Sequence, residues 1–290
     1  MGPRDGGAAG DDRGAESGAA CVSVPSTDAR AAAARGIDGD RDVAKVLLND
    51  ELCHAAGCGA LGRVKRCLSR GADPSGPRDV IESADRLFRN PLHQAAVALH
   101  VHVVRALVKS GAVCSPFLFL MLCKKACTLP ERVLDKILPI LQLLLDYGTD
   151  PSAEAAMSYE TSAAGTFRRW GRMTPIRYVA TEGRVDVLKL LLANGARVNG
   201  SEGALALIAS MCPGFSLRHC RPRGESGFIA CDHLGVARLL LQSGADPTRI
   251  VDHATPLCVA RSRGDFCDFA KLFESDPRVQ RALARRRCAN

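Results

Sequence analysis

Apolar residues recur at helical spacing along most of this chain, and the same stop signal ends each run. In five places, apolar residues at positions i, i+3 and i+4 are followed by a glycine and usually a small residue. A glycine at this point is typical of a helix that ends in the left-handed backbone conformation. The pattern therefore predicts five copies of one helix, each ending at a glycine: Gly71, Gly111, Gly148, Gly195 and Gly244.

A second pattern precedes the first. Asn90, Thr174 and Thr255 are each followed by proline and a short run of apolar and small residues. The side-chain oxygen of such a residue caps a helix, and proline at the first helical position loses no useful donor. Weaker copies begin at Asp50 and Ser115. We expect a short helix to start at each of these positions.

The two patterns in alternation resemble the ankyrin repeat, whose motif is T-P-L-H-x-A-A, a loop, a second helix and then G-A-D. The agreement is closest over residues 174–199. The resemblance implies an all-α fold, an ankyrin-repeat solenoid of about six helix-pair units with irregular insertions. The expected units are residues 50–75, 90–114, 115–152, 173–199, 202–249 and 254–276.

The spacing of the units is irregular. Successive terminal glycines lie 37 to 49 residues apart, whereas the ankyrin period is about 33 residues. The surplus predicts four insertions. Residues 76–89 and 153–172 lengthen the loops between units, and residues 124–135 and 213–232 split the helix pairs of the third and fifth units.

Composition divides the chain into three parts. Residues 1–42 are rich in Gly, Ala, Asp and Arg and have few large apolar residues, so they are expected to form a disordered tail. Residues 43–276 form the predicted ankyrin-repeat domain. Residues 277–290 contain five Arg and no acidic residue, and they are interpreted as a basic tail or a cap helix. Aromatic residues make up only 4%, which favours an aliphatic, helical core.

The cysteine content and the absence of long apolar segments indicate the cellular compartment in which the protein is expected. The chain has 13 Cys without tight spacing, which is typical of reduced thiols. The first residues lack the apolar region of a signal peptide, and no stretch fits the roughly 20 apolar residues that span a bilayer. We therefore expect a cytoplasmic location, with the nucleus as the alternative, a monomer, and no membrane partner.

No catalytic motif or cofactor motif occurs, so neither an enzyme nor a cofactor is expected. One group of metal-ligand types lies in the fifth unit's insertion and comprises Cys212, Cys220, Cys231 and His233, with His219 nearby. Thiolate and imidazole suit zinc. However, the sequence has no C-x-x-C pair that would hold two ligands close together. We therefore interpret these cysteines as free or buried thiols and expect no bound metal.

Basic residues in the insertions are the remaining sequence feature that indicates a binding surface. The candidate partner-binding residues lie in two of these insertions, and they are Arg168, Arg169, Trp170, Arg172, Arg218, Arg221 and Arg223. Trp and Arg are over-represented in binding hot spots, and Trp170 is the only Trp in the chain. The sequence therefore predicts a non-catalytic scaffold that binds one or more proteins through the concave face and the loop tips of the stack.

Two alternatives remain. Residues Leu129–Leu138 resemble the opening of an F-box, which implies a substrate adaptor of a ubiquitin ligase. The basic insertions, in a chain of net charge +8, could instead contact an acidic partner or nucleic-acid phosphates. Nucleic acid is not the expected partner.

Overall fold

The computed structural model describes residues 40–76, 90–160, 168–211, 232–262 and 266–288. The chain divides into two units, residues 1–47 and 48–290. The described part of the first unit is the start of helix α2 (Asp40–Gly57). The second unit contains the repeats.

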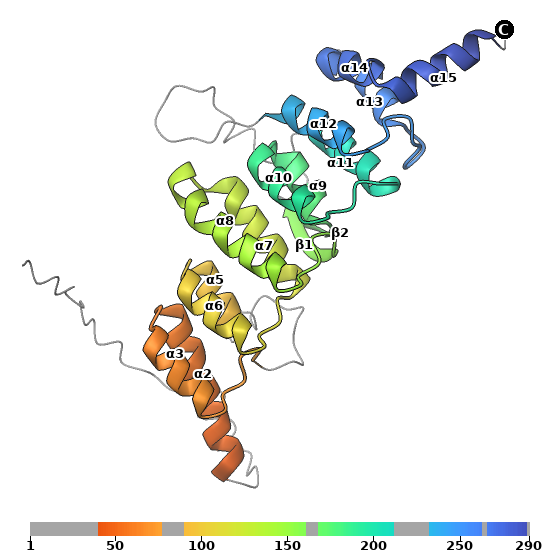
Figure 1. Cartoon of the computed structure of the whole chain (residues 1–290). Coiled ribbons are helices and arrows are strands. Elements are labelled where there is room, and N and C mark those ends of the chain that lie inside the picture. The colour runs from red at the N-terminus through yellow and green to blue at the C-terminus, as the bar shows by residue number, and fades with distance from the viewer. Residues whose placement is uncertain (1–39, 77–89, 161–167, 212–231, 263–265, 289–290) are drawn as a thin grey trace, which may run out of the picture. The chain divides into compact units, whose positions relative to one another are not determined.

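Six helix pairs follow one another in the described chain (Figure 1). The first helices of the pairs are α2, α5 (Pro91–Val97), α7 (Pro116–Thr128), α9 (Pro175–Glu182), α11 (Ser201–Met211) and α13 (Pro256–Ser262). The second helices are α3 (Leu61–Ser69), α6 (Val101–Lys109), α8 (Glu131–Asp146), α10 (Val185–Ala193), α12 (His233–Gln242) and α14 (Cys267–Glu274). A last helix, α15 (Pro277–Cys288), packs against α14.

Four of the first helices begin at the predicted caps, whereas α2 begins at Asp40 and not at Asp50, where the sequence predicted a start. The side chains of Asn90, Ser115, Thr174 and Thr255 each accept a hydrogen bond from the backbone N–H three residues later, at 2.9 to 3.3 Å. A proline follows each of these caps and occupies the first helical position. These starts are set by local sequence, because the cap satisfies a donor that the helix itself cannot pair.

The second helices also end as predicted. All five glycines have positive φ, between 83° and 104°, and each follows the last turn of a helix. The residue after each glycine donates its backbone N–H to a carbonyl five residues earlier, as Ala72 does to Cys67 and Ala245 to Leu240. This hydrogen bond pairs a carbonyl at the helix end and turns the chain toward the next unit.

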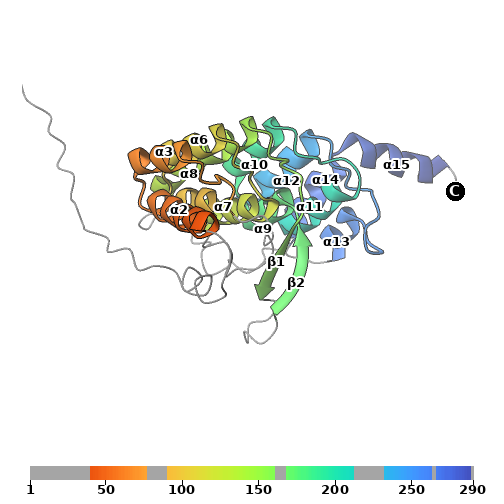
Figure 2. The ribbon, with the colours of Figure 1, turned by 90° about the horizontal axis from the view of Figure 1, so that it is seen from below.

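Helix pairs stack side by side within the second unit. Figure 2 shows the second helices in one row and the first helices in the other. Neighbours pack within each row, for example α7 against α9 and α12 against α14. Small residues in the first helices, among them Ala95, Ala96 and Ala180, are fully buried and allow this close approach. The prediction of an all-α stack of about six helix pairs is confirmed.

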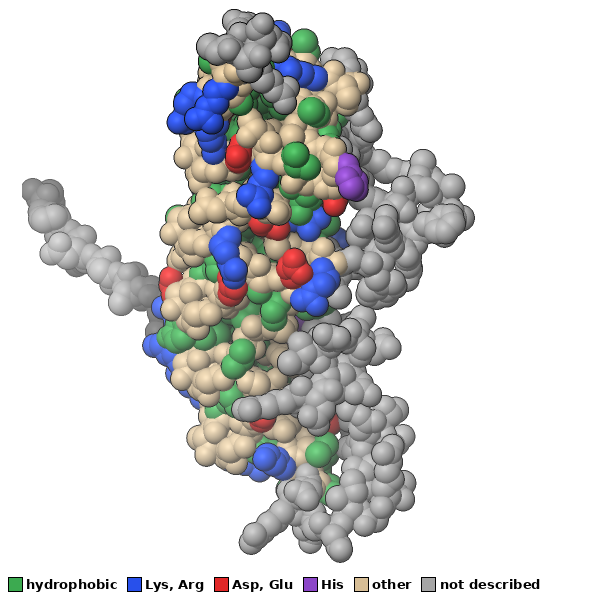
Figure 3. Space-filling view, turned by 90° about the vertical axis from the view of Figure 1, so that its right-hand side faces the viewer, with side chains coloured by type: hydrophobic (Ala, Val, Ile, Leu, Met, Phe, Trp, Pro, Cys, Tyr) green, Lys and Arg blue, Asp and Glu red, His purple; other side chains and the backbone are tan. Residues whose placement is uncertain are grey.

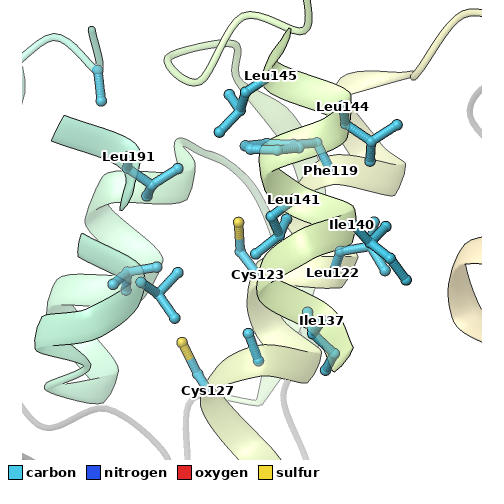
Figure 4. Packing of buried hydrophobic residues seen from close by; sticks show 14 of the residues in the cluster. Phe119, Leu122, Cys123, Cys127, Ile137, Ile140, Leu141, Leu144, Leu145 and Leu191 are labelled. Carbon is cyan, nitrogen blue, oxygen red and sulfur yellow. The ribbon is translucent and has the colours of Figure 1, made fainter. Parts of the chain in front are cut away.

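The third pair supplies most of the large, fully buried side chains of the described core, and Figure 4 shows part of its packing. Phe119 and Leu122 on α7 face Ile137, Ile140 and Leu141 on α8, and each is at most 1% exposed. Fully burying one such side chain contributes about 1.5–3 kcal/mol. This pair therefore stabilises the units on both sides of it.

Two expectations about the insertions were wrong. Residues 124–135 do not form a long loop, because α7 continues to Thr128 and α8 begins at Glu131. The buried side chains of Ala126 and Leu134 extend the apolar faces of both helices, so the surplus residues lengthen the pair.

The insertion at 153–172 is also not an irregular loop. It contains strands β1 (Ala155–Glu160) and β2 (Arg168–Met173), paired antiparallel from Ala155 with Met173 to Glu160 with Arg168. The hairpin projects away from the two rows of helices (Figure 2). Trp170, expected on a loop, therefore lies in a strand, opposite Ser158.

Candidate functional site

Loops that follow the second helices share one built-in turn. In three of the five units whose second helix ends at a glycine, Asp is followed by Pro, and the carboxylate accepts a backbone hydrogen bond from the residue after the proline. These bonds are Ser75 to Asp73 at 2.9 Å, Ser152 to Asp150 at 2.8 Å, and Thr248 to Asp246 at 2.9 Å. An Asp side chain commonly fixes a turn in this way. The loop tips are therefore held by their own sequence.

Neighbouring loops are joined by further hydrogen bonds. The backbone N–H of Val113 donates to Ser75 Oγ at 3.3 Å, and that of Arg197 donates to Ser152 Oγ at 2.8 Å. Arg197 also pairs with Asp150 at 3.2 Å, although both side chains are largely exposed. The loops thus form a connected surface instead of separate flexible ends. Figure 3 shows one face of the molecule, and basic and acidic side chains lie close together near the middle of it.

A shallow groove of about 340 Å³ lies on this surface between the second and third units. Val113 and Cys114 line one side, and Tyr147 and Thr149 line the other. Val113 is 70% exposed and Tyr147 is 48% exposed. A further exposed apolar side chain, Ile250 at 72%, lies in the loop before α13. We call Val113, Tyr147 and Ile250 the loop-tip apolar residues.

The groove offers no activated nucleophile. Burial raises the pKa of the Cys114 thiol to about 12, so the sulfur stays protonated at neutral pH. Burial also raises the pKa of Cys123, which lies in the core behind it.

The predicted binding residues are only partly located. Arg168, Arg169, Trp170 and Arg172 all lie along β2. Of their side chains, the structure describes that of Arg172, which is 73% exposed and donates from Nε to Glu154 at 2.9 Å. The other predicted residues, Arg218, Arg221 and Arg223, lie outside the described residues.

The candidate metal ligands are not brought together in the described chain. Cys212, His219, Cys220 and Cys231 lie outside the described residues. His233 begins α12, and both of its ring nitrogens are buried without a hydrogen-bond partner. Its ring lies over Gly183, where a Cβ would approach it to 2.9 Å. Among the described residues, no three His, Cys, Asp or Glu side chains could hold a metal ion.

The F-box-like segment lies within the stack. Leu134 is buried, and Leu138 is half-buried against the same core. Leu129 also packs against that core. Because these side chains stabilise the third unit, they are not available to bind an adaptor in the folded chain. The observations do not favour the adaptor alternative.

Sequence reasoning missed the loop-tip apolar residues, although the repeat alignment contains a signal for two of them. Val113 stands where three other units have Asp. Tyr147 directly precedes a terminal glycine, whereas the other units have Arg70, Ser110, Asn194 and Ser243 there. An apolar residue at a position that is otherwise polar and solvent-facing indicates a contact surface.

Comparison with known proteins identifies relatives by structure alone. No protein-family model and no curated protein matches the chain. An ankyrin repeat domain from Acinetobacter baumannii AYE is 23% identical, with a TM-score of 0.48 over 77% of this chain and 95% of that one. The ankyrin repeat protein EF0377 is 19% identical, with a TM-score of 0.47 over 78% of this chain and 96% of that one.

The fold of the described chain is that of an ankyrin-repeat protein. This assignment is carried by the stacked helix pairs, the capped first helices and the left-handed glycine at the end of each of five second helices. Within the described residues, no helix is long and apolar enough to cross a membrane.

Proposed function

We propose that this chain is a non-catalytic scaffold that binds a partner protein through its loop tips and the exposed surface of its first helices. One observation carries the proposal. The large apolar side chains that stay exposed in described residues 48–290 are the loop-tip apolar residues and Val97 on α5. The outward faces of the described second helices have none. Exposed apolar side chains gathered on one kind of surface are typical of protein contacts.

A connected surface lowers the conformational entropy that is lost when a partner binds. The loops are held by their own turns and by hydrogen bonds between units, so little ordering is needed when a partner binds. The β2 residues Arg168, Arg169, Trp170 and Arg172 and the insertion residues Arg218, Arg221 and Arg223 are proposed to extend this surface. A cytoplasmic or nuclear location and a monomeric state remain predictions.

The test compares variants by affinity purification and mass spectrometry. The loop variant changes Val113, Tyr147 and Ile250 to Ser, and a separate variant is Trp170→Ala. The matched control changes Lys136, Lys189 and Arg238, which are exposed on the second helices, to Ser. Hot-spot truncations cost about 2 kcal/mol or more, which is roughly a 30-fold loss of affinity.

We expect the same partners with the wild-type chain and the control, and their loss from the loop variant. Recovery of identical partners from all variants, each folded by circular dichroism, would contradict the proposal.

A further inference from the structure

The Lys and Arg side chains on the outward faces of helices α3 and α6 are not accompanied by any Asp or Glu of the same helices. Their inward faces are buried through residues such as Val64 and Cys67 on α3 and Val104 and Leu107 on α6. The two helices pack against each other, so their outward faces are adjacent. The exposed basic residues on this surface, which we call the α3–α6 basic face, are Lys65, Arg66, Arg70, Arg105 and Lys109.

Among the residues that the structure describes, no salt bridge joins an acidic side chain to this face. Neither helix contains Asp or Glu. Among the described residues, the ion pair that involves α3 is Arg63 with Glu51 at 3.8 Å, and Arg63 is not part of the face. Arg66 and Arg70 are four residues apart, as are Arg105 and Lys109. Like charges at this spacing repel along a helix.

The second helices α8, α10 and α14 do not show this pattern, because each of them also carries an acidic residue. Asp135 lies next to Lys136 on α8, Asp186 lies near Lys189 on α10, and Lys271 pairs with Asp268 at 3.5 Å on α14. Cations can stabilise the last turn of a helix. However, α8, α10 and α12 end without a basic residue in that turn. The excess of cations on α3 and α6 is therefore not a general requirement of these helices.

We propose that the α3–α6 basic face binds an acidic segment of a partner protein, as a second contact surface that is separate from the loop tips. The cations at i and i+4 on two adjacent helices match Asp or Glu at the same spacing on a partner helix. Neither α3 nor α6 has a Phe, Tyr or Trp side chain on which bases could stack. Neither exposes a large apolar side chain that could enter a lipid surface.

The experiment measures binding of a fluorescein-labelled helical peptide with Glu at every fourth position to the full chain by anisotropy at low ionic strength. The test variant changes Lys65, Arg105 and Lys109 to Gln. The control changes Lys136, Lys189 and Arg238 to Gln, and it removes the same charge from the outward faces of α8, α10 and α12. A single-stranded DNA oligonucleotide and phosphatidylserine vesicles serve as competing probes.

We expect the peptide to bind the wild-type chain and the control equally, and the test variant at least about fivefold more weakly. An equal loss in both variants would show an effect of net charge alone and would overturn the proposal. So would a lack of peptide binding, or tighter binding of the DNA or the vesicles that depends on the same three residues. The loop variant should bind the peptide normally, which separates this outcome from that of the proposed function.

Discussion

At the residue scale, two buried histidines make the stability of the stack depend on pH. Burial lowers the pKa of His93, with a smaller contribution from Lys125, and burial lowers the pKa of His233. Nδ1 of His93 and both ring nitrogens of His233 are buried without a partner. A lowered pKa in the folded state means that the unfolded chain binds these protons more readily.

Stability should therefore be constant above the ordinary histidine pKa of about 6.5 and should fall as the pH drops below it. By pH 5.5 we expect a loss of up to about 1 kcal/mol for each histidine. Urea unfolding at pH 7.5 and at pH 5.5 measures the loss. His233→Gln should reduce the difference between the two pH values. His102→Gln, at an exposed position, should not. A pH difference that is unchanged in His233→Gln would contradict the assignment.

At the element scale, α15 is attached to the stack by the hydrogen bonds of Arg278 and by the buried side chain of Val279. Arg278 donates to the carbonyl of Gly244 at 3.0 Å and to that of Leu241 at 3.4 Å, at the end of α12. It also donates from Nη2 to Asp276 Oδ2 at 2.7 Å, and this contact lowers the pKa of Asp276. Val279 is buried at the same junction. Arg278 thus adds hydrogen bonds to carbonyls at the C-terminal end of α12 and fixes the start of α15.

Arg278→Ala should destabilise the C-terminal units by about 1–3 kcal/mol, because it leaves the buried Asp276 carboxylate unpaired. Arg278→Lys should recover only part of this loss, since an ammonium group lacks the planar fork. Hydrogen exchange of α12 and α14 measures the effect. Arg281→Ala is the control, because this exposed residue donates only to Pro277 within its own helix in the described contacts. Equal exchange in Arg278→Ala and Arg281→Ala would contradict the role of Arg278.

Elements whose signals are local could be predicted from sequence, and those that depend on distant contacts could not. The caps at Asn90 and Thr174 and the stops at the five glycines involve only a few neighbouring residues. The β1–β2 hairpin was missed because its stability comes from pairing across residues 161–167. The α3–α6 basic face was missed for a similar reason. It combines Lys65 and Arg105, which are adjacent only after the units stack.

At the scale of the whole molecule, each unit is stabilised mainly by the neighbours that it contacts. The α7–α8 pair lies in the middle of the stack and contacts units on both sides through α5, α6 and α9. The α13–α14 pair lies toward the C-terminal end and contacts α11, α12 and α15. In such an arrangement, stability is approximately a sum of the units and the interfaces between neighbours. A destabilising substitution in the middle of the stack should therefore affect unfolding differently from one near the end.

Leu141→Ala creates a cavity in the α7–α8 pair, where Leu141 is fully buried (Figure 4). It should lower the free energy of unfolding by about 2–5 kcal/mol and weaken the link between the two halves of the stack.

Leu257→Ala, in α13 near the end, should lower the free energy of unfolding by less and should loosen only the last units, since Leu257 is 9% exposed. Urea unfolding followed by hydrogen exchange measures both variants. We expect Leu141→Ala to separate unfolding into two transitions, with α3 and α6 exchanging independently of α10 and α12, while Leu257→Ala keeps one main transition. A single transition in both variants would contradict this expectation, because it would mean that the stack unfolds as one cooperative block. Binding at the α3–α6 basic face would then stabilise the distant units as strongly as the near ones.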